Sequence, residues 1–259
     1  MRLTTVRLSG DRTAAARVER RRLVLLPFPD VSAILATGEH WQDHTTAPST
    51  PSTTASDAGP LVTGLAVLIE TGVNYAARAR ELGAPRPDAP ELFTTPVDRL
   101  VGDRDTVHTD RAADLRWGVE LGVVIGRETS RVSPASALGH VAGYTAVTVV
   151  AAPGQPATVA VGPQLVTPDE LPLGARGLVL TATHDGRLRQ RATTSDLLFD
   201  VATLIAHASA TTTLVPGDLL TTGTPAGAAT DPLEDGSEIV AAVKGIGELH
   251  LTVAGRSGR

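Results

Sequence analysis

Short apolar runs bounded by Gly, Pro or Asp recur along most of the chain. Each run is rich in β-branched residues and shorter than an average helix, which favours β-strands. The strands predicted in this way cover Leu23–Leu26, Leu65–Ile69, Val119–Ile125, Val141–Val150, Leu178–Thr183 and Ile239–Val243. The run Leu65–Ile69 contains no polar position, so we expect it to be a buried strand.

Helical spacing of apolar residues is less common than strand patterns. One helix is predicted over Tyr75–Leu82, and it stops at Gly83 before a proline-rich stretch. Another is predicted over residues 31–44, with Ser32 as its N-cap, and it loses its pattern near Gly38. Both predicted helices are short, so they would cover little of a β-rich core.

The clearest helical pattern lies in the last third of the chain. Thr194 or Ser195 is its predicted N-cap, and Asp196 lies in its first turn. Its apolar stripe consists of Leu197, Leu198, Val201, Leu204 and Ile205. Many short strands with few helices indicate an α+β protein that is mostly β, built as a roll or barrel. Strands and helices do not alternate strictly, which argues against a doubly wound sheet.

The pattern also suggests how the chain is divided. Residues 1–60 are expected to form a small N-terminal β-lobe followed by a flexible linker, and residues 61–259 a β-roll catalytic domain. The linker is placed at residues 45–60, which are rich in Thr, Ser, Pro and Ala and show no periodicity. A segment of that composition buries too little apolar surface to form a core of its own.

Composition excludes several classes of function. The 259 residues contain no cysteine, so disulfides, thiolate zinc sites and cysteine nucleophiles are excluded. The formal net charge of −5 gives no overall attraction to nucleic acid or anionic membranes. No apolar run approaches the ~18 residues of a membrane span, and the first residues lack the apolar stretch of a signal peptide. We therefore expect a cytoplasmic protein whose partner is a small molecule, with no nucleic-acid or membrane partner.

A set of motifs between residues 65 and 253 occurs in a specific order. The motifs include Gly72–Tyr75, Gly118–Gly126, Val141–Thr145, Gly162-Pro163 and Pro216–Gly227. In order and spacing they resemble the fumarylacetoacetate hydrolase (FAH) family, and the segment from Pro216 to Gly227 is the most specific match. The resemblance implies a β-roll or barrel, a homodimer, and an active site at the mouth of the roll.

Members of this family act on 1,3-dicarbonyl or 2-oxo acid compounds. They hold Mg²⁺ or Ca²⁺ with carboxylates as a Lewis acid, and a His-based dyad activates water. The resemblance places a Glu-x-Glu ligand pair at Gly118 and Glu120, the third carboxylate at Val149, and the base His at Arg78. One carboxylate cannot hold a hexacoordinate Mg²⁺, so we expect no metal and no other cofactor.

Other positions of the family's site are changed as well. The Lys of a Phe-x-Lys-Pro turn corresponds to Thr95, and a nearby Arg and Asp correspond to Pro153 and Gly154. A lysine that precedes Gly162-Pro163 in the family is lost in a deletion. Arg78 stays protonated, so it cannot take up a proton as the family's His does, and its charge repels a cation.

The scaffold of the family's pocket is retained. We expect Glu120 and Arg78 to be catalytic. The expected substrate-binding residues are Asn74, Tyr75, Trp117, Gln190, Thr222, Gly223 and Thr224. A solvated loop position is the alternative for Gln190.

The other site residues also have structural interpretations. Glu120 and Arg78 would pair across an emptied cavity, and the pairing would lower the pKa of Glu120. Asn74 and Gly223 would serve only their turns. Trp117 would pack in the core or at the lip of the pocket instead of stacking on a substrate.

These expectations favour a metal-independent enzyme on the FAH scaffold. It would bind an enolised 1,3-dicarbonyl compound, with Arg78 as counter-charge, and promote a cyclisation, tautomerisation or other isomerisation by positioning. Specialised metabolism, such as polyketide or other natural-product biosynthesis, would suit such a cyclase or isomerase. The alternatives are a non-catalytic FAH-like binding protein and a Mg²⁺-dependent C–C hydrolase or decarboxylase of the acylpyruvate type.

Overall fold

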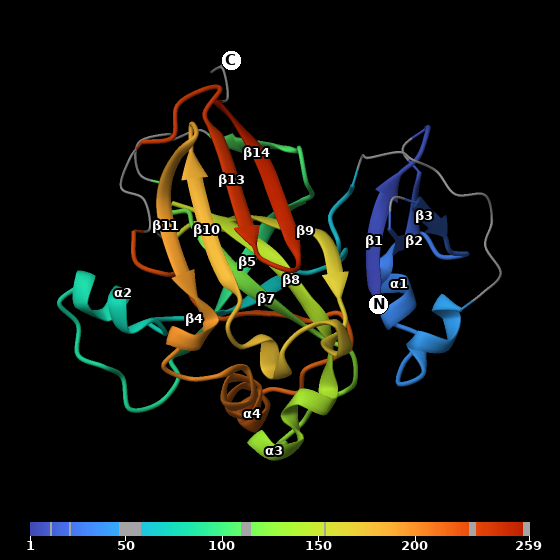
Figure 1. Ribbon diagram of the computed structural model, residues 1–259, viewed down its shortest axis with the longest axis horizontal. Helices are drawn as coiled ribbons and strands as arrows, with labels where there is room; N and C mark the ends of the chain where they lie inside the picture. Colours follow the sequence, from blue (N-terminus) through green and yellow to red (C-terminus); the bar gives the residue numbers. More distant parts are fainter. Residues whose placement is uncertain are drawn as a thin grey trace.

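The computed structural model describes residues 1–10, 12–20, 22–46, 58–109, 115–152, 154–227 and 232–255. It is an α+β fold that is mostly β, as the sequence predicts (Figure 1). Its strands are β1 (Arg2–Arg7), β2 (Thr13–Glu19), β3 (Arg22–Leu25), β4 (Val67–Thr71), β5 (Leu92–Val101), β6 (Thr106–Thr109), β7 (Val119–Ile125), β8 (Val141–Val150), β9 (Ala157–Val166), β10 (Val179–His184), β11 (Arg187–Thr193), β12 (Leu219–Thr221), β13 (Glu238–Val243) and β14 (Gly247–Gly255).

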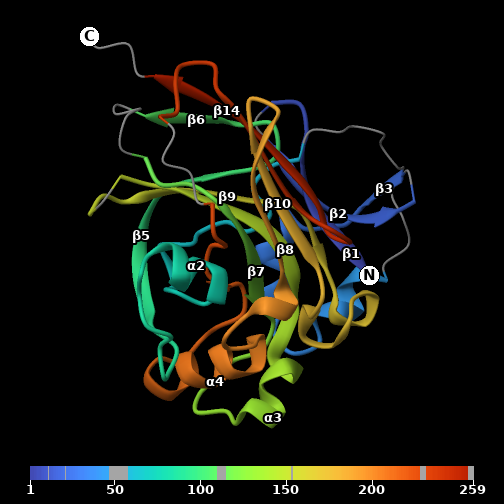
Figure 2. The ribbon, with the colours of Figure 1, turned by 60° about the vertical axis from the view of Figure 1, so that its left-hand side comes forward.

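Helices are few and short. The α-helices are α1 (Val31–Leu35), α2 (Ala76–Glu81), α3 (Pro134–Ala137) and α4 (Val201–Thr211). Single 3₁₀ turns are η1 (Trp41–Thr45), η3 (Leu138–His140), η4 (Pro168–Glu170), η5 (Leu173–Ala175) and η6 (Thr194–Asp196). Figures 1 and 2 show α3 and α4 together at one end of the sheets, with α2 beside β4.

The strands form a closed barrel and a second sheet. The large sheet has the order β3-β2-β1-β9-β5-β4-β12-β7-β8, and the additional pairing of β9 with β8 closes its last six strands into a barrel. The second sheet, β11-β10-β13-β14-β6, covers the barrel on the side of β7, β8 and β9 (Figure 2). This arrangement is the β-roll or barrel that the sequence predicts.

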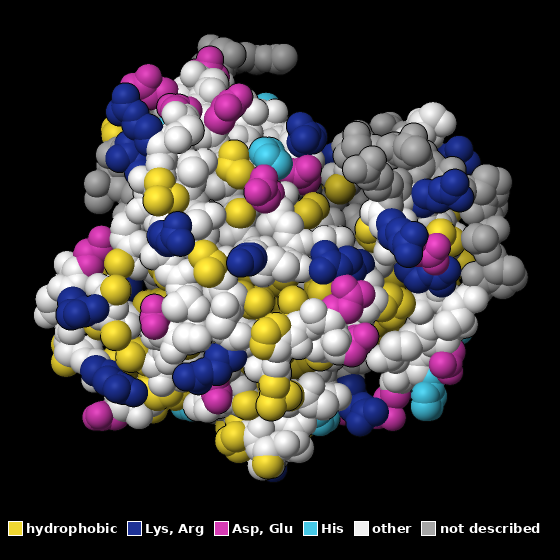
Figure 3. Space-filling view, in the orientation of Figure 1, with side chains coloured by type: hydrophobic (Ala, Val, Ile, Leu, Met, Phe, Trp, Pro, Cys, Tyr) yellow, Lys and Arg dark blue, Asp and Glu magenta, His cyan; other side chains and the backbone are white. Residues whose placement is uncertain are grey.

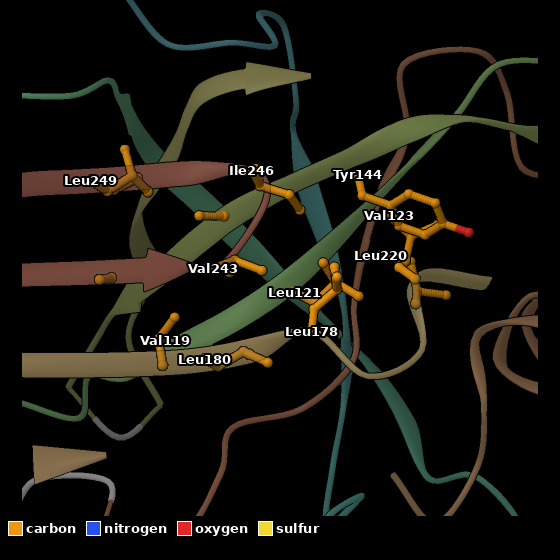
Figure 4. Packing of buried hydrophobic residues seen from close by; sticks show 14 of the residues in the cluster. Val119, Leu121, Val123, Tyr144, Leu178, Leu180, Leu220, Val243, Ile246 and Leu249 are labelled. Carbon is orange, nitrogen blue, oxygen red and sulfur yellow. The ribbon is translucent and has the colours of Figure 1, made fainter. Parts of the chain in front are cut away.

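Alternation along β7 separates two apolar cores. Its odd-numbered residues pack against the second sheet in a core that includes Val119, Leu121, Val123, Leu180, Val243 and Leu249 (Figure 4). Val124 belongs instead to a second cluster, together with Leu219 of β12 and Leu68 of β4. Because residues two apart share a face of a strand, Glu120 and Gly122 lie on the side of Val124, inside the barrel.

The N-terminal lobe extends the barrel sheet. β1 pairs with β9 at Arg2 and Leu3, so the lobe is hydrogen-bonded to the barrel. Buried residues of α1 and η1 belong to the same apolar cluster as the barrel interior: Val31, Ile34, Leu35 and Trp41. The division of the chain at residue 60 stays a prediction, and the two parts share this cluster.

The predicted linker over residues 45–60 lies mostly outside the described residues, since 47–57 are not among them. Its two ends are packed. Thr45 is buried in η1, and the backbone N–H of Gly59 donates to the carbonyl of Thr5 over 2.9 Å. The linker is therefore anchored to the lobe at both sides.

Two helix starts differ from the sequence prediction. α1 begins at Val31 and ends at Leu35, and its N-cap is Asp30 rather than Ser32. The Asp30 carboxylate accepts a hydrogen bond from the N–H of Ala33 over 2.8 Å, which satisfies a free donor of the first turn.

The start of α4 was also predicted too early. Thr194, Ser195 and Asp196 form the separate turn η6, and Leu197 and Leu198 precede the helix. Asp200 is the N-cap, and its carboxylate accepts from the N–H of Thr203 over 2.9 Å. The strand predicted at Leu65 likewise starts later, at Val67, which is half-exposed rather than buried.

The surface agrees with the modest net charge. On the face shown in Figure 3, Lys and Arg side chains are interspersed with Asp and Glu instead of gathering in one basic patch. No helix among the described residues is long and apolar enough to cross a bilayer.

Candidate functional site

Glu120 is a carboxyl group buried at one mouth of the barrel. It lies near the start of β7, and its Oε2 accepts a hydrogen bond from the backbone N–H of Gly223 over 3.1 Å. Thr221, at the end of β12, lies opposite Gly122 of β7 and shares the interior face with Glu120. The structure therefore joins Glu120 to the Thr-Gly-Thr turn.

Gly223 is required at the centre of that turn. Its φ is +88°, a left-handed conformation that glycine adopts without strain. A Cβ at this position would also lie 2.8 Å from the carbonyl oxygen of Gly72 and 3.2 Å from Cβ of Asn74. Any side chain would push the turn away from Glu120.

Asn74 holds the turn from the other side. Its side chain is fully buried and donates to the carbonyls of Thr222 over 2.9 Å and of Phe199 over 3.1 Å. Its Oδ1 accepts from the N–H of Phe199 over 2.8 Å. Both polar atoms of the Asn74 side chain therefore have hydrogen-bond partners within the protein. This supports the interpretation that Asn74 stabilises the turn instead of binding a substrate.

Gln190 is buried rather than solvated. Its Oε1 accepts from the N–H of Val119 over 2.8 Å. Its Nε2 donates to the carbonyl of Pro225 over 3.0 Å and to Oγ1 of Thr224 over 3.5 Å. Gln190 therefore links β11 to β7 and to the end of the Thr-Gly-Thr turn.

The residues present do not fit the family's divalent cation. A Cβ on Gly118 would overlap the hydroxyl of Thr224 and lie 2.9 Å from Oε1 of Gln190, so these two side chains fill the place of the first ligand. Val149 packs against the apolar cluster of the barrel. Within the described ranges, no group of three His, Cys, Asp or Glu residues is arranged to hold a metal ion.

Burial raises the pKa of Glu120 to about 8. The neighbouring hydroxyl of Thr221 lowers it, the charge of Glu70 raises it, and the N–H of Gly223 lowers it again. Near neutral pH this carboxyl group is therefore largely protonated and able to donate a hydrogen bond.

Arg78 does not pair with Glu120. Its Nη1 donates to Oε2 of Glu81 over 2.5 Å within α2, and Oε1 of Glu81 accepts from the N–H of Gly227 over 2.9 Å. The predicted pair and the lowered pKa of Glu120 are both wrong, because Arg78 is three residues from Glu81 on the same helical turn. Glu81, which Arg78 contacts, instead ties α2 to the segment that follows the Thr-Gly-Thr turn.

Tyr75 and Trp117 are both buried. Trp117 belongs to the core between the sheets, and its ring meets His184 edge-on with centroids 5.7 Å apart. Core packing therefore describes Trp117 better than a stacking platform. Burial raises the pKa of Tyr75, and the neighbouring hydroxyl of Thr222 lowers it in part. Neither hydroxyl has a partner in hydrogen-bonding geometry within the part of the chain that the structure describes.

Glu70 was missed in the sequence. It lies on β4, and its Oε1 accepts a hydrogen bond from the hydroxyl of Thr95. Burial raises the pKa of Glu70, and Thr95 lowers it in part. In the sequence, Glu70 is a single acidic residue directly after the apolar run 65–69. An acidic residue in that place is ordinarily interpreted as the solvated end of a strand.

Pro153 lies outside the described residues, so the structure does not place it. Six of the nine expected site residues gather around one turn. Glu120, Asn74, Gln190, Thr222, Gly223 and Thr224 are connected by the hydrogen bonds above. Arg78 and Trp117 lie outside this network.

Comparison with known proteins identifies the family. The family model described as fumarylacetoacetate (FAA) hydrolase C-terminal matches residues 67–254. The homoprotocatechuate catabolism bifunctional isomerase/decarboxylase of Escherichia coli is 36% identical over 202 residues, which cover 70% of this chain and 45% of that protein.

Solved structures show the same fold over the whole chain. The 5-carboxymethyl-2-hydroxymuconate delta-isomerase of Mycobacterium smegmatis superposes with a TM-score of 0.80 at 28% identity, covering 100% of both chains. A fumarylacetoacetate hydrolase of Exiguobacterium antarcticum gives 0.85 at 24% identity, covering 99% of this chain and 100% of that one, a likeness of fold alone. Since the family model spans most of the sequence, the chain belongs to the fumarylacetoacetate hydrolase family.

Proposed function

We propose that this protein is a metal-independent isomerase or cyclase that binds an enolised 1,3-dicarbonyl compound at the mouth of the barrel. The observation that carries the proposal is the buried carboxyl group of Glu120, held by Gly223 in a site whose other metal-ligand positions are Gly118 and Val149. The names of the M. smegmatis and E. coli relatives, both of which include an isomerase, support this reaction class.

The chemistry follows from the protonation of Glu120. A neutral carboxyl group can donate a hydrogen bond to a carbonyl oxygen and stabilise the enolate that forms when a neighbouring C–H is deprotonated. An environment that keeps a carboxyl group neutral near pH 7 is a known means of stabilising an enolate. Proton transfer between carbon and oxygen needs no activated water, in contrast to hydrolysis of a C–C bond.

The Thr-Gly-Thr turn and Arg78 would supply binding. The free hydroxyl of Thr222 is adjacent to Gly223, and we assign it to a substrate oxygen. Arg78 is one-fifth exposed and lies in α2, which Glu81 links to Gly227. We assign it to an anionic substituent at the rim, because its guanidinium has more donors than its contact with Glu81 uses. Ring closure of a polyketide-type precursor would begin with the same deprotonation.

The test uses acetylpyruvate, a simple enolisable 1,3-dicarbonyl compound. We expect the protein to accelerate exchange of its C3 protons in D₂O, followed by ¹H NMR, with and without EDTA. Glu120→Gln should slow exchange by about 100-fold, the usual range for losing an acid–base group, while Glu128→Gln on the surface should leave it unchanged. Calorimetric titration with Mg²⁺ should show no specific binding.

Two results would contradict the proposal. Loss of exchange on adding EDTA, with recovery on adding Mg²⁺, would indicate the metal-dependent hydrolase or decarboxylase. A protein that binds acetylpyruvate without accelerating exchange, in the wild type as in Glu120→Gln, would be a non-catalytic binding protein.

A further inference from the structure

A cavity of about 440 Å³ lies between β6, the middle of β5 and the connection from β8 to β9. None of the expected site residues is among the described residues that line it, so it is separate from the Thr-Gly-Thr turn. Its volume falls within the range of about 300–1,000 Å³ that small-molecule sites occupy in proteins. The cavity is therefore large enough for a small organic ligand.

Strand β8 separates this cavity from the barrel interior. Val149 packs against the apolar cluster inside the barrel, whereas the next residue, Val150, belongs to the core between the sheets and lines the cavity. Successive residues of a strand point to opposite faces. Leu115 also lines the cavity and packs against the core between the sheets. A ligand in this cavity would therefore contact the outer face of the barrel wall and not the mouth of the barrel.

The part of the cavity wall that β5 forms contains an irregularity at Asp98. β5 pairs in parallel with β9, where Val97 lies opposite Ala157 and Arg99 opposite Thr158, so Asp98 is an extra residue without a partner. Bulges of this kind bend a strand and re-aim a side chain, and they are uncommon in parallel pairs. Asp98 and Thr158 both line the cavity. The bulge therefore places a carboxylate in the cavity wall, beside a hydroxyl group.

The lining combines a carboxylate with an apolar floor. Asp98 is the acidic residue among the described residues of the lining, and none of these is Lys or Arg. The side chains of Asp98 and Gln155 are exposed and form no hydrogen bond or ion pair with other described residues. The apolar part includes Val107, which is buried, and Leu115, which is half-buried. His108 belongs to the polar part, and a neutral imidazole has one nitrogen that accepts a hydrogen bond.

We propose that this cavity is a second binding site, which takes a small organic amine with an apolar body. The ammonium group binds the carboxylate of Asp98, and the side-chain oxygen of Gln155 accepts a further N–H. The apolar body packs against Val107 and Leu115 and is removed from water. An anion is disfavoured, because Asp98 repels it and no Lys or Arg of the described lining offsets the repulsion. The inference does not depend on the proposed function, since no residue assigned to that reaction takes part.

Benzylamine is the probe, because it joins an ammonium group to an apolar ring. It is titrated at pH 7.5 into ¹⁵N-labelled wild type, and the backbone amide shifts are followed by NMR. We expect saturable shifts at residues 107–109 and 155–158, with residues 222–224 unchanged. Benzyl alcohol has the same ring without the charge, so it should bind about fivefold more weakly, which is the effect of a partly exposed ion pair.

Two substitutions test the contacts. Asp98→Asn should weaken binding of benzylamine about fivefold and leave benzyl alcohol unchanged, whereas Asp88→Asn, at an exposed aspartate outside the lining, should alter neither. Ala152→Leu enlarges a lining side chain and should abolish saturable binding of both probes. Thermal unfolding checks that each variant is folded, and the comparison of Asp98→Asn with wild type decides the proposal if Ala152→Leu does not fold.

Three results would overturn the inference. Shifts that rise linearly with benzylamine, without saturation, would show nonspecific association. Saturable shifts centred on residues 222–224 would place the ligand in the mouth of the barrel. Equal affinity of wild type and Asp98→Asn for benzylamine would remove the ion pair from the site, and with it the preference for an amine.

Discussion

At the scale of single residues, Gly118 stands where the family resemblance places a carboxylate ligand. The space in which a side chain at 118 would lie is occupied by Thr224 and Gln190, and Gln190 is fixed by bonds to Val119 and Pro225. A glutamate ligand could therefore return only if Thr224 moved. The absence of a carboxylate at position 118 and the filling of its space by Thr224 and Gln190 therefore go together.

A double-mutant cycle tests this packing. Gly118→Ala places a Cβ against the Thr224 hydroxyl, and we expect it to lower the free energy of unfolding by about 1–3 kcal/mol. In a Thr224→Ala background, the same change should cost clearly less, because the nearest obstructing atom is absent. Urea unfolding of the four proteins measures the coupling, and strictly additive costs would show that Thr224 does not fill this space.

Individual site residues were predicted unevenly from the sequence. The family resemblance put Glu120 and the turn at Gly223 in one site, and the structure joins them through the N–H of Gly223. The ion-pair partner of Arg78 was wrong, since the sequence does not show which of two acids its long side chain reaches. Glu70 was missed because its neighbour Thr221 is 151 residues away in the chain.

At the scale of elements, the apolar strands β7, β8, β10 and β13 were predicted, and β5 and β11 were not. β11 (Arg187–Thr193) is mostly polar and is the edge strand of its sheet among the described residues, so its pattern gives little signal. β5 contains Pro96 and turns several polar residues outward. Their strand conformation depends on neighbours distant in sequence, and local patterns do not contain that information.

The cap of α4 provides a test at this scale. Asp200→Ala should destabilise the protein by about 1 kcal/mol, because the N–H of Thr203 loses its side-chain acceptor. Asp200→Asn should retain most of the stability. Ser195→Ala changes a cap position predicted from the sequence and should have little effect on stability, measured by thermal unfolding. A larger loss of stability in Ser195→Ala than in Asp200→Ala would show that Ser195 is the N-cap after all.

At the scale of the whole molecule, the buried carboxyl group makes stability depend on pH. The pKa of Glu120 rises from its ordinary 4.5 to about 8 on folding, so the folded state holds the proton more tightly than the unfolded chain. The stabilisation is complete below pH 4.5 and is lost as the pH rises to about 8. Across this interval the free energy of unfolding should fall by about 1.4 kcal/mol per pH unit from this group.

Glu120→Gln isolates that contribution, because glutamine keeps the shape and does not titrate. The difference in unfolding free energy between wild type and variant, measured by urea denaturation from pH 5 to pH 8, should shift steadily in favour of the variant. A difference that stays constant over this range would mean that Glu120 is ionised throughout.

Pairing of the first strand with the ninth has a consequence for how the chain folds. The amino group of Met1 bonds to Thr167, and β1 meets β9 across more than half of the sequence. During synthesis, the N-terminal lobe therefore emerges long before the strand that receives it. Bringing such distant segments together costs chain entropy before their contacts can stabilise the protein. We therefore expect slow folding in which β1 and β9 pair late.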